Sequence, residues 1–312
     1  MNTALYLVVR VLIGVVQLLP LRGVARLGRG IGALVWILDR RHRNVTLRNL
    51  ERCFAGEKSP EEIHKLAKET LRRIGENFAC SAKTAAMSIE ELRPHLEFGG
   101  NRQVLDVRDS AGQRRLVVAI GHFGNFELYA RFTDTACGFE LATTYRALRQ
   151  PALNRIFQAL RERSGCHYFE RRTDAQALKT FMNGPRVILG LLADQHAGDN
   201  GMRIPFFGHE CSTSAAPAIF AHRYGAALFT AICYRVDLAK WRIEIGDEIP
   251  TMVDGKPRSG EAIMADVNRA YEVAVRRDPE NWFWVHNRWK PVRVQKRPPP
   301  PPEVPAAEAP VA

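Results

Sequence analysis

Apolar and polar positions along the chain form blocks whose lengths suit strands and helices in turn. Short apolar runs, several of them β-branched, predict strands, and segments with apolar residues every three or four positions predict helices. The alternation predicts an α/β fold in which helices flank a mixed central sheet. The predicted strands are 96–98, 116–120, 139–144, 187–192, 227–234 and 241–245. One predicted helix begins at Ser59, and the others cover 151–164, 175–183, 214–223 and 260–276.

The first 55 residues differ from this pattern. Residues 4–19 are almost continuously apolar, residues 23–38 form a second apolar stretch, and the basic residues 40–43 close it. Neither stretch reaches the roughly 20 residues of a clear membrane span. We interpret the segment as a membrane-anchoring helical region, either one tilted helix or an interfacial pair, on the cytoplasmic side. The alternative is a buried helical hairpin with an arginine-rich outer face.

Three regions follow from these patterns: an anchoring segment over 1–55, a main domain over 56–296, and a Pro/Ala-rich tail over 297–312 that is expected to be disordered. With 312 residues, 46% of them hydrophobic, the chain can bury a full core. Its six cysteines are scattered without a CxxC pair, which indicates reduced thiols.

The formal charge of +12 is concentrated near the N-terminus, where residues 1–52 hold nine arginines against Asp39 and Glu51. A basic surface attracts the phosphates of nucleic acids or of anionic lipids. The adjacent apolar stretches favour lipid. Residues 282–290, WFWVHNRWK, interleave aromatic and basic side chains. This pattern suits a membrane interface, nucleobase stacking or a core helix, and we expect a mixed structural and interfacial role.

The most informative stretch is the strand 116–120 with the residues that follow it. Gly121-His122-Phe123-Gly124 forms a turn, and Asn125 can cap a helix whose first turn carries Glu127. The break between strand and helix allows His122 and Glu127 to converge. A carboxylate at a helix N-terminus can hold a neighbouring imidazole as a general base. Backbone N–H groups of the glycine turn and the helix start are candidate oxyanion donors.

Two further polar clusters follow predicted strands, where α/β proteins bind ligands. Arg146 comes after the strand 139–144 and can hold a phosphate or a developing oxyanion. Asp194, Gln195 and His196 follow the strand 187–192, and Asp194 can orient a basic residue. They open a long connection, 194–212, of a kind that is usually functional. We expect no metal site, because no pair has the helical spacing of preorganised ligands.

Together these clusters resemble the bacterial lipid A late acyltransferases, the lauroyl/myristoyl transferase group of the lysophospholipid-acyltransferase-like superfamily. The likeness covers about residues 4–290. It is carried by GHFGNFE, YRALRQPALN, LADQHAG with the following IPFFG, the run Ser212-Thr213-Ser214, and WFWVHNRWK, in the family's order. The chain departs from the family where an arginine-proline pair is replaced by Arg146-Ala147.

The resemblance implies a glycerolipid acyltransferase-like fold at the cytoplasmic face of the cell inner membrane. It implies transfer of an acyl chain from an acyl carrier protein or coenzyme A thioester to a hydroxyl of a phosphorylated, lipid A-type glycolipid, with no cofactor. His122 is then the general base and Glu127 its orienting partner, while Arg146, Asp194, Gln195 and Asn125 are expected to bind substrate.

Direct transfer is favoured over an acyl-enzyme, because no Ser or Cys lies in a nucleophile-elbow motif. Two other functions are compatible with the sequence. One is acylation of a different membrane lipid, such as a phosphatidylinositol mannoside, an aminolipid or a lysophospholipid. The other is a non-catalytic, basic membrane-binding or nucleic-acid-binding protein.

Overall fold

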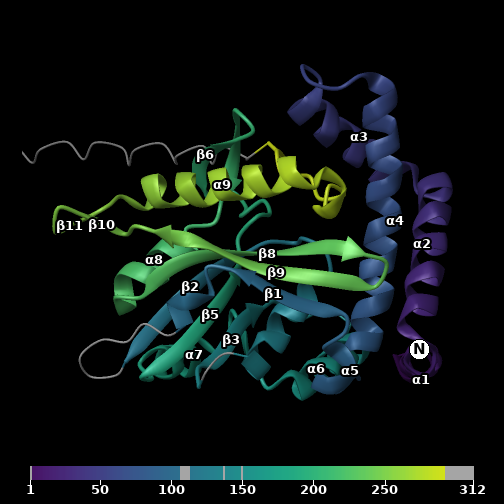
Figure 1. Ribbon diagram of the computed structural model, residues 1–312, viewed down its shortest axis with the longest axis horizontal. Coiled ribbons are helices and arrows are strands. Elements are labelled where there is room, and N and C mark those ends of the chain that lie inside the picture. The colour runs from purple at the N-terminus through teal and green to yellow at the C-terminus, as the bar shows by residue number, and fades with distance from the viewer. Residues whose placement is uncertain (1, 106–112, 136–137, 149, 292–312) are drawn as a thin grey trace, which may run out of the picture.

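The computed structural model describes residues 2–105, 113–135, 138–148 and 150–291. The predicted tail, 297–312, lies outside the described residues. A seven-stranded sheet in the order β1-β9-β8-β2-β5-β3-β4 forms the centre of the molecule (Figure 1). All its pairs are parallel except β8 with β9, so the predicted mixed sheet is confirmed. Its strands are β1 (Leu96–Gly100), β2 (Arg114–Ile120), β3 (Glu140–Tyr145), β4 (His167–Glu170), β5 (Arg186–Leu192), β8 (Ala227–Asp237) and β9 (Lys240–Ile249).

The two faces of the sheet have different partners because side chains alternate along each strand. Val117 and Ala119 of β2 point into the main core, which is closed by α8 (Ala216–Tyr224) and α9 (Gly260–Arg277). Leu116 points to the opposite face, which α6 (Pro151–Arg161) and the 3₁₀ helix η2 (Phe126–Thr135) cover. Figure 1 shows α9 and α6 on opposite sides of the sheet.

Helix α4 (Pro60–Thr84) crosses the end of the sheet (Figure 1). It begins as the sequence predicts: the Ser59 hydroxyl accepts from the Glu62 N–H, and the Glu62 carboxylate accepts from the Ser59 N–H. Helix α2 (Leu21–Leu38) packs along α4 at close range. A Cβ added to Gly32 would lie 2.2 Å from the Leu71 carbonyl oxygen, so this crossing requires glycine.

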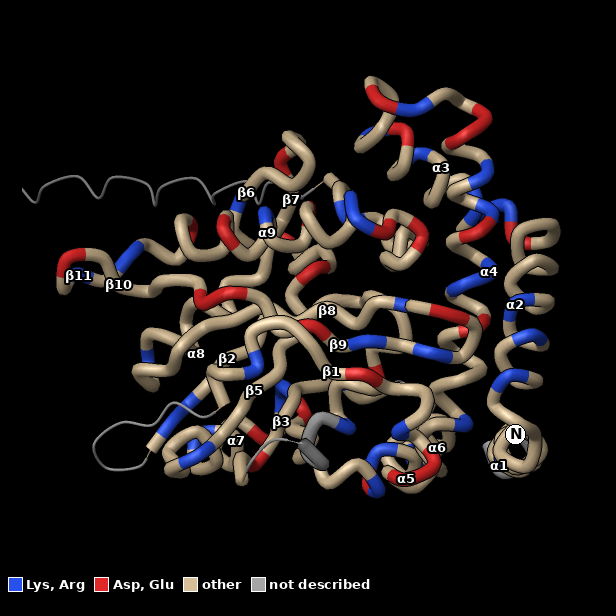
Figure 2. The backbone as a smooth tube through the Cα atoms, viewed as in Figure 1, with Lys and Arg blue, Asp and Glu red and all other residues tan. Residues whose placement is uncertain are grey.

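The N-terminal segment consists of α1 (Asn2–Leu18), α2 and α3 (Arg40–Phe54). No helix among the described residues is long and apolar enough to cross a membrane. Both α1 and α2 nevertheless expose apolar side chains, and Lys and Arg positions lie along α2 and α4 (Figure 2). The exposed apolar residues are Leu7, Val8, Val11, Leu12, Val15 and Leu18 on α1, and Leu27, Ile31, Leu34, Ile37 and Leu38 on α2.

Several elements differ from the sequence-based expectation. The connection 194–212 contains a β-hairpin, and strand β4 was not predicted. The segment 282–290, for which a mixed structural and interfacial role is predicted, is irregular, so the alternative of a core helix is wrong; its three tryptophans are buried, so the segment contributes to the core. The cysteines of the described part form no disulfide.

The remaining elements are α5 (Ile89–Leu92), α7 (Ala175–Met182), β6 (Met202–Phe206), β7 (His209–Thr213), β10 (Met252–Val253), β11 (Lys256–Pro257), η1 (Arg102–Leu105), η3 (Glu162–Ser164) and η4 (Pro279–Asn281).

Candidate active site

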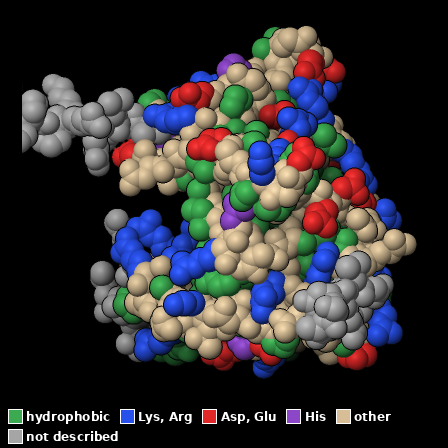
Figure 3. All heavy atoms as spheres, turned by 90° about the vertical axis from the view of Figure 1, so that its left-hand side faces the viewer, with side chains coloured by type: hydrophobic (Ala, Val, Ile, Leu, Met, Phe, Trp, Pro, Cys, Tyr) green, Lys and Arg blue, Asp and Glu red, His purple; other side chains and the backbone are tan. Residues whose placement is uncertain are grey.

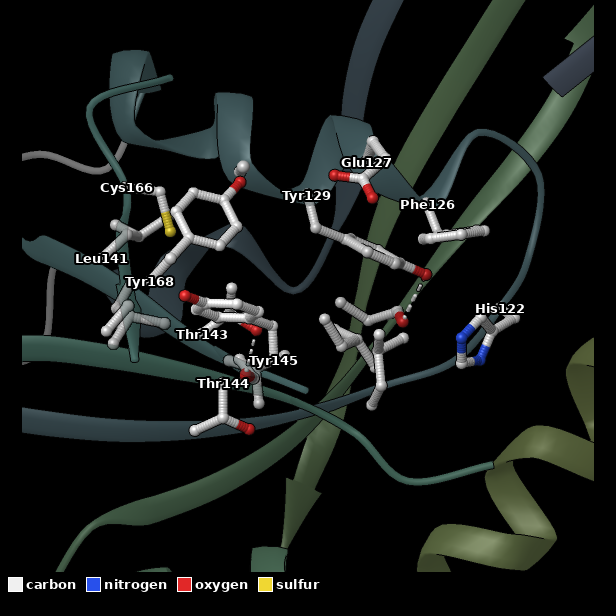
Figure 4. A pocket seen from close by; sticks show the side chains of 18 of the residues that line it. His122, Phe126, Glu127, Tyr129, Leu141, Thr143, Thr144, Tyr145, Cys166 and Tyr168 are labelled. Atoms are coloured by element: carbon white, nitrogen blue, oxygen red, sulfur yellow. Dashed lines mark hydrogen bonds between the residues drawn. The ribbon is translucent and has the colours of Figure 1, made fainter. Parts of the chain in front are cut away.

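A cavity of about 590 Å³ lies between the sheet and the layer formed by η2 and α6 (Figure 4). Its polar end is at the carboxyl ends of the central strands, where His122, Gln195 and His196 line it. Its deeper wall is apolar, because it is built from side chains on one face of five strands. These include Leu116, Val118, Leu141, Ile188, Leu192, Phe229 and Ile245.

The turn after β2 depends on two glycines. A Cβ on Gly121 would lie 2.6 Å from the Phe123 ring and 3.2 Å from the carboxyl carbon of Asp194. Gly124 has a φ of 51°, and a Cβ there would lie 2.5 Å from the Cys233 carbonyl oxygen. The chain can therefore turn sharply and bring His122 close to the end of β5.

His122 is held by Asp194 through two contacts. The imidazole Nδ1 lies 2.8 Å from Asp194 Oδ1, and the His122 backbone N–H donates to Oδ2 at 2.9 Å. The indole N–H of Trp282 also donates to Oδ2, at 2.8 Å. The pairing follows from the sheet, since β2 and β5 are parallel neighbours and both residues follow the strand ends.

Asp194 is buried and ionised. Burial raises the pKa of its carboxyl, but the His122 charge and the hydrogen bonds from His122 and Trp282 outweigh that effect and lower it to about 2. A carboxylate only accepts hydrogen bonds, so the imidazole carries its proton on Nδ1. In the neutral ring, Nε2 then keeps its lone pair. Since no hydrogen bond to Nε2 occurs within the described ranges, this atom is free to accept a proton.

The structure differs from the predicted pairing of His122 with Glu127. Among the described residues Glu127 has no hydrogen bond to His122; it binds Arg161 at 2.8 and 3.3 Å. Figure 4 shows Glu127 and His122 on either side of Phe126, whose ring packs against the imidazole with centroids 4.8 Å apart. The carboxylate that orients His122 is Asp194, because β5 is adjacent to β2 whereas η2 faces α6. Both Glu127 and His122 line the cavity, and a catalytic role for Glu127 stays a prediction.

The other predicted substrate-binding residues occupy different places. Gln195 and Arg146 line the cavity, Arg146 at its exposed rim. Asn125 does not: it is 1% exposed, and its amide donates to the Thr84 hydroxyl at 3.4 Å. A direct contact of Asn125 with substrate therefore conflicts with its position. Its side chain instead contacts the end of α4.

The backbone donors expected in the glycine turn are already engaged. The N–H groups of His122, Phe123 and Gly124 donate to Asp194, to the Gly121 carbonyl and to the Asn281 carbonyl. These three groups are therefore occupied rather than directed at an oxyanion.

A second layer of contacts fixes the segment after β5. The buried guanidinium of Arg288 donates to the carbonyls of Gln195 and Ser212. The His196 N–H donates to Nε2 of His286 at 3.0 Å, and burial lowers the pKa of His286 to about 4, so that this ring is neutral. Arg288 and His286 both belong to the segment 282–290, which therefore fixes the backbone of Gln195 and His196.

Sequence reasoning missed two functional contacts. The sequence predicts a mixed structural and interfacial role for the segment 282–290, but its alternating aromatic and basic side chains do not indicate that Trp282 is the ring that meets a carboxylate. Arg161 received no role, since it lies within an amphipathic helix like many solvated arginines. No group of three or more potential metal ligands occurs in the part of the chain that the structure describes.

The sequence matches proteins of one family over most of its length. Residues 2–291 match the family model described as bacterial lipid A biosynthesis acyltransferase. The chain is similar to a lipid A biosynthesis palmitoleoyltransferase of Escherichia coli, with 26% identity over 87% of this chain and 86% of the relative. It has the same identity to a Shigella flexneri lipid A biosynthesis acyltransferase, with the same coverage. It is also 26% identical to an E. coli lipid A biosynthesis lauroyltransferase, over 88% of both chains.

The family match spans the cavity, the strand ends that carry His122 and Asp194, and the segment that contributes Trp282. The chain belongs to the bacterial lipid A biosynthesis acyltransferase family, and it is an acyltransferase.

Proposed function

We propose that this acyltransferase moves a fatty acyl chain from an acyl carrier protein or coenzyme A thioester to a hydroxyl of a lipid A-type glycolipid. The observation that carries the proposal is His122, whose Nδ1 is held by Asp194 at the polar end of a cavity whose deeper wall is apolar. The names of the relatives support the acceptor class.

In the proposed reaction, Nε2 of His122 accepts the proton of the acceptor hydroxyl. The hydroxyl oxygen attacks the thioester carbonyl, the carbon–sulfur bond breaks, and the departing sulfur takes the proton from the imidazolium. Asp194 stabilises that imidazolium without taking its proton. The products are an ester and a free thiol. No covalent acyl-enzyme is needed.

The apolar wall is suited to the acyl chain. Each methylene that leaves water for such a wall contributes about 0.8 kcal/mol to binding. In this proposal the acyl chain enters beside His122 and extends along β2 toward Leu116 and Phe229, at the far end of the cavity. Chain-length preference then follows from the depth of this wall.

A membrane-bound acceptor requires the enzyme to meet the lipid surface, and we assign that contact to the exposed apolar side chains of α1 and α2. The basic character of the molecule supports this orientation, because cationic side chains favour anionic headgroups. Figure 3 shows the side of the molecule that faces away from α1 and α2; basic side chains occur there among acidic ones, so the positive charge is not confined to the N-terminal helices.

The chemical proposal is tested with His122→Ala and a matched control, His167→Ala. His167 lies on β4, and its side chain is 53% exposed. Thiol release from acyl carrier protein or coenzyme A thioesters is measured with a phosphorylated, lipid A-type glycolipid as acceptor. We expect His122→Ala to lower turnover at least ~100-fold and the control to keep full activity. Near-normal turnover by a folded His122→Ala enzyme would refute the role of His122.

The membrane contact is tested separately with Val11→Glu and Val273→Glu. Both side chains are 64% exposed, but Val11 lies on α1 and Val273 on α9. Sedimentation with vesicles containing anionic lipid is expected to weaken about tenfold for Val11→Glu only, since the change removes apolar contact and adds repulsion. Equal binding by the two variants contradicts the assignment of α1 to the membrane surface.

A further inference from the structure

Two arginines stand together at one side of the cavity. Tyr145 and Glu170 are register partners at the ends of the parallel strands β3 and β4, so the next residues, Arg146 and Arg171, leave the sheet side by side. The Arg171 N–H donates to the Tyr145 carbonyl at 3.1 Å, which keeps the two chain segments paired beyond the strands. Both side chains line the cavity.

Neither guanidinium has a carboxylate partner within the described ranges. Arg171 uses its Nε to donate to the Thr144 hydroxyl at 3.2 Å, which leaves its other N–H groups available. Partial burial lowers the pKa of Arg171, and the nearby charge of Arg146 lowers it further, while Glu170 raises it. The two like charges repel each other, and an anionic ligand bound by both guanidiniums would offset that repulsion.

Glu170 explains why the arginines stay together without being neutralised. One carboxylate oxygen accepts from the N–H groups of Arg172 at 2.6 Å and Thr173 at 3.1 Å, and the other accepts from the Ala147 N–H at 3.4 Å. The carboxylate thus holds both loops through the backbone. Glu170 is 8% exposed, so its carboxylate holds the backbone of the two loops inside the protein and does not compete with a ligand for the guanidiniums at the rim.

We propose that Arg146 and Arg171 form a clamp for a phosphate group of one of the two substrates. The proposal rests on the proposed acyl transfer and specifies how a substrate is positioned for it. Arginine forks suit phosphate oxygens because they offer pairs of charge-assisted hydrogen bonds.

The sheet sets the distance between this clamp and the reacting atoms. β3 lies two strand positions from β2, and β4 lies three positions away. With neighbouring strands about 4.8 Å apart, the phosphate binds roughly 10–14 Å to one side of His122. Two sources of phosphate fit this chemistry: a phosphate on the sugar of the acceptor, and the phosphodiester of the phosphopantetheine arm of the donor.

The experiment measures equilibrium binding without turnover, so its outcome is independent of whether acyl transfer is the reaction. Wild type, Arg146→Ala and Arg171→Ala are titrated with a phosphorylated glycolipid, with its dephosphorylated counterpart, and with coenzyme A. Arg172→Ala is the matched control, because it removes the same charge from an adjacent exposed residue that does not line the cavity. Arg171→Lys tests whether the charge alone is sufficient.

We expect each alanine variant to bind one phosphorylated ligand at least ~10-fold more weakly, as for the loss of charged hydrogen bonds. Arg171→Lys should recover only part of the loss, and Arg172→Ala should match wild type. A loss confined to the phosphorylated glycolipid, and absent for its dephosphorylated form, identifies the acceptor as the source. A loss confined to coenzyme A identifies the donor. Losses no larger than that of Arg172→Ala for every ligand would overturn the clamp.

Discussion

Replacement of Asp194 by Asn tests which carboxylate controls His122. The change keeps the shape of the side chain but replaces one acceptor oxygen with an NH₂ donor. In wild type, Oδ1 faces the His122 ring and Oδ2 accepts from the His122 backbone N–H and the Trp282 indole. An asparagine cannot satisfy both sides. Its NH₂ group must face either the Nδ1–H of His122 or the two N–H donors that Oδ2 accepts from in wild type.

Each orientation has a distinct cost. If the amide NH₂ faces the ring, Nδ1 must become the acceptor, the proton moves to Nε2, and the base is lost. If the NH₂ faces Trp282 and the backbone, two buried donors lose their partner, at about 1–3 kcal/mol each. We therefore expect kcat to fall ~10²- to 10⁴-fold, the range for a general base and for the equivalent change in an Asp–His pair. The KM should change little.

Stability supplies a second signal with a defined pH dependence. The pKa of Asp194 is lowered from 3.8 to about 2, so its ionised form contributes stability above the ordinary pKa. The contribution is about 2 kcal/mol and is lost as the pH falls through the folded-state value. The difference in unfolding free energy between wild type and Asp194→Asn should therefore be largest at neutral pH. It should narrow between pH 4 and 2.

The assays are steady-state thiol release, denaturant unfolding as a function of pH, and nitrogen chemical shifts of the His122 ring. The matched control is Glu127→Gln, which removes a carboxylate that binds Arg161 instead. It should leave the Nδ1–H form of the ring intact, whatever its effect on turnover. A folded Asp194→Asn enzyme with near-normal kcat and unchanged ring shifts would refute the reasoning, as would a change of tautomer in Glu127→Gln alone.

Three other predictions follow from the structure. Gly190→Leu adds a side chain to the cavity wall, and activity should shift to shorter acyl donors by about fourfold per excluded methylene, measured by competition between donors. Glu76→Ala leaves the largely buried guanidinium of Arg235 without a carboxylate and Arg29 with Glu69 alone, and should cost about 3–5 kcal/mol in denaturant unfolding. The pKa of His286 is lowered from 6.5 to about 4, so the unfolded chain takes up its proton first; the melting temperature should fall as the pH drops from 6.5 toward 4, and His286→Gln should reduce this dependence.

The strand ends were the best predicted part of the chain. The apolar runs at 116–120 and 187–192 are largely buried on both faces of the sheet, so they stand out in the sequence as short continuous apolar runs, and the polar residues that follow lie at one edge of the sheet. Strand β4 was missed because His167–Glu170 is short and polar at both ends. It is a strand because β3 offers it an open edge.

The N-terminal segment shows where apolar periodicity alone is ambiguous. The residues of α2 carry one stripe that packs on α4 and another that faces outward, and the sequence does not distinguish the two. The stripe that packs on α4 is the one that carries Gly28 and Gly32, because these glycines and Gly75 of α4 let the backbones of the two helices approach closely. Their complementarity becomes visible only once two segments about 45 residues apart along the chain are brought together.

The assignment of the orienting carboxylate to Glu127 failed for a related reason. Sequence proximity favours Glu127, five residues from His122, over Asp194, which is 72 residues away. In a parallel sheet, however, neighbours at the strand ends come from different strands, and the intervening helix carries nearby residues to the opposite layer. Glu127 therefore meets Arg161 of α6 across the cavity from the sheet. The same rule pairs Arg146 with Arg171, so the sheet order, more than spacing along the chain, determines which polar residues act together.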